Sequence, residues 1–259
     1  MLDRFDFTGK VAVITGAGDG IGKAAACKFY EAGAMIVLVD RDVERLIDLE
    51  RKNGWAEHRY LCCHADVSIE NDVSAYIQKA VQRFGRIDVM FNNAGISINK
   101  PVIEVTQEDL IRYYSTNVWS IYYNLKHVIP TMSRTGGGSI INTASVDGFS
   151  GAINNTIYAG TKHAVLGLSK CAALETADKD IRINCICPGA VNTNIIRSYI
   201  EEGTAEEKAQ REAYLKNLIP MGRFLEPDEV ADYVLFLASD LSKYMTGSKL
   251  VIDGGRTLE

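Results

Sequence analysis

Ser145, Tyr158 and Lys162 are residues whose types and spacing could carry out a reaction. Tyr158 and Lys162 lie four positions apart in the segment Tyr-Ala-Gly-Thr-Lys, and Ser145 precedes Tyr158 by thirteen positions. Positions i and i+4 share one face of a helix, so the phenol and the ammonium are expected to point into the same pocket. Because a nearby cation favours the phenolate, we expect Lys162 to lower the pKa of Tyr158 below its usual value of about 10. Such a tyrosine can exchange a proton with an alcohol oxygen, to which Ser145 can hydrogen-bond.

A glycine-rich turn near the start of the chain predicts a dinucleotide site. Residues 15–22 read Thr-Gly-Ala-Gly-Asp-Gly-Ile-Gly, between an apolar β-branched run and an Ala-rich segment that favours a helix. The strict Gly-x-Gly-x-x-Gly spacing fails at Ile21, but Gly16, Gly20 and Gly22 fit Gly-x-x-x-Gly-x-Gly. Strand, glycine turn and helix together can hold a pyrophosphate at the helix N-terminus. The alternative interpretation of the turn is a flexible loop.

Acidic residues near this turn favour NAD as the cofactor over NADP. Asp40 ends the second predicted strand, eighteen positions after Gly22, where a carboxylate can bind the ribose 2′-hydroxyl of NAD. Its charge would repel the 2′-phosphate of NADP, and Asp19 within the turn adds to this effect. Arg41 argues the other way, because its guanidinium could bind a phosphate. The structural alternative for Asp40 is to cap the next helix.

Further motifs follow in order, and together they resemble a known family. The motifs are Thr15–Gly22, Asp66-Val67, Asn92-Asn93-Ala94-Gly95, Asn117, Ser145, Tyr158 with Lys162, and Pro188-Gly189. With all seven in register, the chain resembles the single-domain short-chain dehydrogenases/reductases from Gly9 to Gly255. The resemblance implies an enzyme that acts on CH–OH groups with a nicotinamide cofactor, and it implies a homotetramer.

The resemblance also implies a role for each motif residue. Tyr158 would be the general acid/base, and Ser145 would bind the substrate oxygen. Lys162 would bind the nicotinamide ribose, and Asn117 would hold a water molecule that links Lys162 to solvent. The implied cofactor contacts are Gly16, Asp19, Gly20, Ile21 and Gly22 in the turn, Asp40, Asp66, Val67 and Asn93 around the adenosine, and Val191 and Thr193 at the nicotinamide, together with Tyr158 and Lys162. In isolation, these residues could instead be strand caps, buried helix amides or turn residues.

Polar residues near the catalytic pair are candidates for substrate binding. Besides Ser145 and Tyr158, the candidates are Asp147, Asn154 and Asn155, with Asn192 and Asn194 from the opposite side. So many polar groups indicate a hydroxylated substrate such as a polyol, a sugar or a diol. The charged segment 192–217 has a helical character, and the resemblance implies that it is a mobile lid. The alternative for this segment is a solvated pair of amphipathic helices, and Arg197 within it could meet an anionic substrate.

Composition restricts the remaining possibilities. The 259 residues are 47% hydrophobic with a net charge of −5, which gives no basic surface for nucleic acid. We expect no membrane span, because no apolar run reaches about eighteen residues, and no signal peptide. The six cysteines and four histidines show no metal-ligand spacing, and free thiols suit a cytoplasmic protein.

Strand and helix signals alternate without a linker, which predicts one α/β domain over 1–259. The expected strands are 10–15, 34–40, 59–65, 87–92, 139–143, 181–187 and 249–252, and the expected helices are 20–32, 41–53, 69–84, 107–133, 156–178 and 227–238. This order predicts a doubly wound Rossmann-type domain, with a seven-stranded parallel sheet flanked by helices on both faces.

Three functions remain open at this stage. The first is an NAD-dependent oxidoreductase that interconverts a secondary alcohol and a ketone. The second is an NADPH-dependent ketone or 3-oxoacyl thioester reductase, against which Asp40 and Asp19 argue. The third is a non-catalytic nucleotide-binding protein on the same fold, which the complete set of catalytic residue types disfavours.

Overall fold

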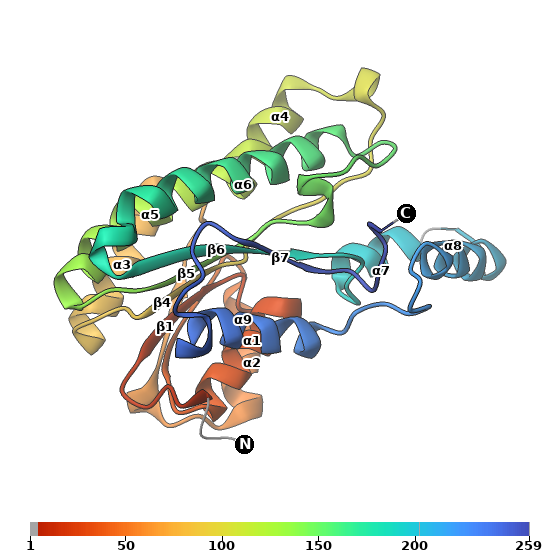
Figure 1. The fold of residues 1–259 in the computed structure, drawn as a ribbon. Helices are drawn as coiled ribbons and strands as arrows, with labels where there is room; N and C mark the ends of the chain where they lie inside the picture. The colour runs from red at the N-terminus through yellow and green to blue at the C-terminus, as the bar shows by residue number, and fades with distance from the viewer. Residues whose placement is uncertain (1–4, 202, 259) are drawn as a thin grey trace.

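A seven-stranded parallel sheet forms the centre of the computed structural model, which describes residues 5–201 and 203–258 (Figure 1). The strands are β1 (Val11–Thr15), β2 (Met35–Asp40), β3 (Tyr60–His64), β4 (Val89–Asn92), β5 (Gly138–Thr143), β6 (Ile181–Pro188) and β7 (Lys249–Ile252). Their order is β3-β2-β1-β4-β5-β6-β7, and every neighbouring pair is parallel. The chain therefore winds outward in both directions from β1 and β4, which confirms the predicted doubly wound sheet.

Helices cover both faces of this sheet. They are α1 (Gly20–Glu31), α2 (Val43–Asn53), α3 (Glu70–Phe84), α4 (Gln107–Tyr114), α5 (Ser120–Thr135), α6 (Thr156–Thr176), α7 (Asn194–Ile200), α8 (Ala205–Asn217) and α9 (Pro227–Ala238). Helices α3, α5 and α6 pack on one face, and α1, α2 and α9 pack on the other (Figure 1). In β1, Val11 and Val13 pack in the core beneath α3, α5 and α6, whereas Ala12 and Ile14 pack in the core beneath α1, α2 and α9. This double burial explains why the strand is apolar at successive positions.

The long helix predicted over 107–133 is interrupted. Helix α4 ends at Tyr114, a π-helical turn spans Ser115–Trp119, and α5 continues to Thr135. A π turn accommodates one extra residue per turn and is often found at functional sites. The spacing of apolar residues on either side of the π turn changes little, so the sequence pattern does not reveal this turn. The consequence for the site is that Asn117 lies within an irregular turn rather than in a regular helix.

Helices α7 and α8 form an arm at one end of the molecule. Figure 1 shows α8 beyond the sheet, on the side where the C-terminus also lies. Their apolar side chains pack around a separate small cluster of Ala190, Ile219 and Phe224. Thr204 and Glu207 form a capping box at the start of α8, with reciprocal side-chain to backbone hydrogen bonds. The helical character predicted for 192–217 is therefore confirmed.

The other predicted elements agree with the structure to within two residues at each end. The helix predicted over 156–178 is α-helical only to Thr176, and a 3₁₀ turn covers Ala177–Lys179. Within residues 5–201 and 203–258, no helix is both long and apolar enough to cross a bilayer. The same residues include no group of three or more His, Cys, Asp or Glu side chains placed to hold a metal ion.

Candidate active site

The predicted catalytic side chains converge beyond the carboxyl ends of the central strands. Ser145 lies two residues after β5, while Tyr158 and Lys162 lie in the first turns of α6. Lys162 Nζ donates a hydrogen bond to the carbonyl of Thr143 at 2.7 Å and lies 5.4 Å from the centre of the Tyr158 ring. Ser145 and Lys162 are buried, and Tyr158 is half-buried. The expectation that one helix face presents the phenol and the ammonium together is confirmed.

Burial dominates the pKa of Tyr158. Desolvation and then the negative charge of Asp147 raise this pKa to about 12, while a hydrogen bond with Ser145 lowers it. The expected pKa of Tyr158 below its usual value of about 10 is therefore wrong for this structure, because burial penalises the phenolate. Desolvation also lowers the pKa of Lys162 to about 8. The ammonium is directed to the carbonyl of Thr143, and burial penalises the charged form of both side chains.

Asn117 connects the loop after β4 to α6. Its Nδ2 donates to the carbonyl of Ile96 at 2.9 Å and to Thr161 Oγ1 at 3.2 Å, and its Oδ1 accepts from the Ile96 N–H at 2.9 Å. Asn117 also lies close to Lys162, because a Cβ atom on Gly95 would be 3.4 Å from Asn117 Oδ1 and 3.7 Å from Lys162 Nζ. The amide thus holds the loop beside Lys162, and the implied water relay stays a prediction.

The glycine turn is shaped as a phosphate site requires. Gly16 has a φ of +64°, and a Cβ atom on Gly22 would lie 2.0 Å from the Gly16 carbonyl oxygen, so a side chain at Gly22 would collide with the backbone. Asn93 Nδ2 donates to the carbonyl of Thr15 at 3.1 Å and ties the turn to the end of β4. Asp19 is the N-cap residue of α1, but no side-chain cap bond is recorded for it in the described part of the chain. The first N–H groups of α1 are therefore suited to an anion, and the turn fits a dinucleotide pyrophosphate.

Asp40 is directed at the turn. Its Oδ2 accepts from the Gly18 N–H at 2.9 Å, and its Oδ1 accepts from the Asp42 N–H at 3.0 Å. The cap of α2 is Asp42, whose side chain accepts from the Arg45 N–H. The alternative interpretation of Asp40 as the helix cap is therefore wrong. Arg41 is exposed, and no side-chain hydrogen bond or ion pair is recorded for it among the described residues.

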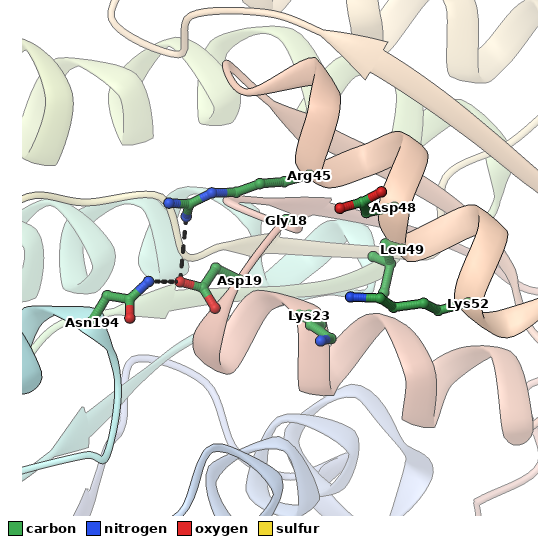
Figure 2. A pocket seen from close by; sticks show the side chains of 8 residues that line it. All are labelled: Gly18, Asp19, Lys23, Arg45, Asp48, Leu49, Lys52 and Asn194. Carbon is green, nitrogen blue, oxygen red and sulfur yellow. Dashed lines mark hydrogen bonds and ion pairs between the residues drawn. The ribbon is translucent and has the colours of Figure 1, made fainter.

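Arg45 is a charged residue of this region that the sequence analysis missed. Its guanidinium contacts Asp19 at 3.3 Å and Asp42 at 3.0 Å, and Asn194 donates to the same Asp19 carboxylate (Figure 2). The sequence could have revealed the pair between Arg45 and Asp42, because Asp42 lies at the helix-capping position three residues before Arg45. The contact with Asp19 depends on how α1 and α2 pack, so no local pattern could reveal it.

A cavity of about 210 Å³ lies against this cluster. Its lining, drawn in Figure 2, consists of Gly18, Asp19, Lys23, Arg45, Asp48, Leu49, Lys52 and Asn194. A second cavity of about 260 Å³ shares Asp19, Lys23 and Asn194 and extends to Arg197 and Asp228. Both cavities therefore lie on the outer side of the glycine turn, away from Ser145 and Tyr158.

The remaining predicted cofactor residues also follow strand ends. Asp66 follows β3, and its Oδ1 accepts from the Ser68 N–H at 2.8 Å, with the buried Val67 beside it. After β6, the segment from Val191 to Thr193 reaches the glycine turn, since a Cβ atom on Gly20 would lie 3.1 Å from Thr193 Cγ2. Ile21 lies half-buried in the first turn of α1. The fold thus brings the predicted cofactor residues to one edge of the sheet.

Asp147 and Asn155 form a pair beside the catalytic side chains. Asn155 Nδ2 donates to Asp147 Oδ2 at 2.7 Å, and the Asp147 N–H donates to Ser145 Oγ at 3.1 Å. Asp147 is buried, and desolvation raises the pKa of its carboxyl group. Asn154 is exposed instead, with a φ of +59°, and its carbonyl accepts from the Lys100 N–H.

The asparagines expected to approach the substrate from the arm are directed elsewhere. Asn192 Nδ2 donates to the carboxylate of Glu226 at 3.0 Å, and Asn192 Oδ1 accepts from Arg197 Nε at 3.0 Å. Asn194 donates to Asp19 in the glycine turn. These carboxylate partners explain the difference, because each amide binds a charged group that the sequence does not show to be near. The expectation for Asn192 and Asn194 is wrong, and Arg197 likewise binds within the arm.

Comparisons with known proteins agree with this geometry. A family model described as Enoyl-(Acyl carrier protein) reductase matches residues 16–257. A cyclohexanol dehydrogenase from an Acinetobacter species is 37% identical over 253 residues, which cover 97% of this chain and 96% of that protein. A short-chain type dehydrogenase/reductase from Mycobacterium marinum superposes with a TM-score of 0.92 at 34% identity, over 100% of this chain and 99% of that chain. L-sorbose reductase from Gluconobacter frateurii, solved with NADPH and L-sorbose, has a TM-score of 0.91 at 33% identity and 99% coverage of both chains.

Proposed function

The chain belongs to the short-chain dehydrogenase/reductase family, and on this premise we propose that it is an NAD-dependent enzyme interconverting a secondary alcohol and a ketone. The observation that carries the proposal is the convergence of Ser145, Tyr158 and the buried Lys162 beyond the ends of β4 to β6. These residues have the chemistry needed to bind and protonate a carbonyl oxygen, or to deprotonate an alcohol. The similarity to a cyclohexanol dehydrogenase supports an alcohol as the substrate.

In this proposal each side chain has one task at the reacting oxygen. Tyr158 gives its proton to that oxygen during reduction and removes it during oxidation. Ser145 Oγ, hydrogen-bonded to Tyr158, holds the same oxygen while its charge changes. Lys162 stabilises the phenolate that remains after proton transfer, and Asn117 holds the loop beside Lys162. A bound nicotinamide would supply or accept the hydride at the substrate carbon.

The proposed cofactor residues are those of the glycine turn and the strand ends. The set comprises Gly16, Asp19, Gly20, Ile21, Gly22, Asp40, Asp66, Val67, Asn93, Val191 and Thr193, with Tyr158 and Lys162. We propose NAD, since Asp19 and Asp42 both pair with Arg45 and the carboxylate of Asp40 lies against the Gly18 N–H of the turn. Their excess negative charge disfavours a 2′-phosphate.

A fluorescence titration with NADH and with NADPH tests the cofactor assignment. We expect NADH to bind more tightly. The sorbose reductase contains NADPH, which supports the alternative, and tighter binding of NADPH here would overturn the assignment.

The second candidate function is reduction of a 3-oxoacyl thioester. The similarity to a 3-oxoacyl-[acyl-carrier-protein] reductase from Thermotoga maritima, 36% identical over 247 residues, favours this candidate. Acetoacetyl-coenzyme A with either reduced cofactor is the appropriate probe. Faster turnover of this thioester than of any simple ketone or alcohol would replace the first proposal with the second.

Replacement of Tyr158 by phenylalanine separates an enzyme from a non-catalytic nucleotide-binding protein. Loss of the phenol removes the proton donor, and we expect kcat to fall by roughly 10²- to 10⁴-fold while NADH binding changes little. The matched control is Tyr244→Phe, at a fully exposed position outside the segment 192–217. Unchanged turnover in Tyr158→Phe would remove Tyr158 from its proposed role.

We also propose the organisation implied by the family. The chain would be one domain with the segment 192–217 as a lid, and the enzyme would be a homotetramer. Exposed apolar side chains on α4, α5 and the turn between them support an assembly through these helices, namely Leu110, Ile111, Trp119 and Tyr122. Light scattering coupled to size-exclusion chromatography measures the assembly directly, and a monomer at micromolar concentration would contradict it.

A further inference from the structure

Asp147 is a buried carboxylate with one oxygen that has no partner. Asp147 is only 8% exposed, and its Oδ2 accepts a hydrogen bond from Asn155 Nδ2 at 2.7 Å. Its Oδ1 is fully buried and accepts no hydrogen bond from residues 5–201 or 203–258. An unpaired buried acceptor is costly, and native proteins rarely leave one without a partner. A hydrogen-bond donor from outside the chain is the simplest partner for Oδ1.

The position of Asp147 indicates where this donor would come from. The Asp147 N–H donates to Ser145 Oγ, and Asn155 lies three residues before Tyr158 at the N-cap of α6. The charge of Asp147 acts on Tyr158 directly. Asp147 is therefore close to both side chains proposed to hold the reacting oxygen.

The surrounding charges favour a neutral donor. Arg256 from the C-terminal segment and His163 from α6 both act electrostatically on Asp147, without a recorded ion pair to it among the described residues. The buried Lys162 adds a further positive charge close to the Tyr158 ring. A substrate ammonium would add another positive charge to this group, so a hydroxyl is the better match for Oδ1.

We propose that Asp147, oriented by Asn155, accepts a hydrogen bond from a second hydroxyl on the carbon next to the reacting carbinol. The substrates would then be vicinal diols or polyols, or the hydroxyketones formed from them. This inference rests on the proposed function, because Ser145 and Tyr158 must hold the first oxygen. A substrate without the second hydroxyl leaves Oδ1 unpaired, and a site built to bind a hydroxyl discriminates strongly against such an analogue.

The test compares cyclohexanol with trans-cyclohexane-1,2-diol, using NAD as the acceptor. The wild-type enzyme should favour the diol in kcat/KM. The Asp147→Ala enzyme should lose roughly 10- to 100-fold of the diol-to-cyclohexanol ratio, as expected for a hydrogen bond to a charged group. Asp147→Asn should lose less, and Asp178→Asn, which changes an exposed carboxylate in the 3₁₀ turn after α6, should leave the ratio unchanged. Circular dichroism confirms that each variant is folded.

A binding measurement tests the inference independently of turnover. In the Tyr158→Phe background with NAD, calorimetry should show that the diol binds roughly 10-fold or more weakly once Asp147→Ala is added. An unchanged diol affinity or an unchanged ratio would overturn the role of Asp147, while loss of turnover in Tyr158→Phe alone would still support the proposed function. A wild-type preference for trans-2-aminocyclohexanol over the diol would overturn the choice of a hydroxyl.

Discussion

The acid/base region around Tyr158 and the adenosine region around Asp40 lie at the same edge of the sheet but follow different physics. Ser145, Asp147 and Lys162 are each less than a tenth exposed, so desolvation is the largest cause of the pKa shifts of Asp147, Tyr158 and Lys162. In the adenosine region, the side chains of Asp19 and Arg45 are 41% and 49% exposed, and ion pairs dominate. Substitutions should therefore have large, salt-independent effects in the first region and small, salt-dependent effects in the second.

The largest effect that this comparison predicts is for Lys162→Met. The change removes the buried cation that would stabilise the Tyr158 phenolate, and we expect kcat/KM to fall by roughly 10²- to 10⁴-fold. Steady-state assays at 0.1 and 1 M salt measure this. The matched control is Lys170→Met on the exposed face of the same helix. A decrease in kcat/KM of less than tenfold, or a decrease that disappears at 1 M salt, would show that Lys162 acts as a weak surface charge.

The same variant should gain stability, because a charged lysine is costly in the interior. The pKa of Lys162 is lowered to about 8 from 10.5, so between these values the unfolded chain binds the proton more tightly than the folded one. Wild-type stability should therefore rise as pH increases from about 8 to 10.5, and Lys162→Met should lack this rise. At pH 7 we expect the variant to be more stable by about 1–3 kcal/mol in urea unfolding. A destabilised variant would show that the bond to the Thr143 carbonyl outweighs the buried charge.

A smaller effect should follow when Asp147 is made neutral. Its negative charge raises the pKa of Tyr158, whereas the bond from Ser145 lowers it. Oxidation requires the phenolate, so its rate should increase with pH through the pKa of Tyr158. In Asp147→Asn the midpoint of this increase should move to lower pH, because one repulsive charge is gone.

The pH profile of kcat/KM for cyclohexanol oxidation measures this shift. Arg256 and His163 also act electrostatically on Asp147. Arg256→Gln is the opposite control because it removes a positive charge, and the midpoint of its pH profile should lie at the wild-type pH or higher. An Asp147→Asn midpoint at higher pH than wild type would contradict the arrangement.

The sequence predicted the parts of both regions that depend on local spacing. The four-residue separation of Tyr158 and Lys162 and the glycine turn follow from helix geometry and backbone sterics, and both were found as expected. The pKa of Tyr158 was predicted in the wrong direction because burial is a property of the packed chain. Arg45 was missed for the same reason, since its contact with Asp19 joins residues 26 positions apart. The π turn at Asn117 leaves the apolar pattern almost unchanged and so was not visible.

The smallest predicted effect is in the adenosine region. In Asp19→Asn the amide keeps the shape of the side chain but removes one of the two carboxylates that pair with Arg45. The ratio of NADPH to NADH affinity should rise, but by less than about tenfold, since exposed ion pairs contribute at most about 1 kcal/mol. Fluorescence titrations at 0.1 and 1 M salt measure the change, which should nearly vanish at 1 M, where the Debye length is about 3 Å. Asp48→Asn, which lines the same cavity but pairs with Arg51, is the matched control. A salt-independent change of a hundredfold would show that Asp19 behaves as a buried charge, and the distinction between the two regions would fail.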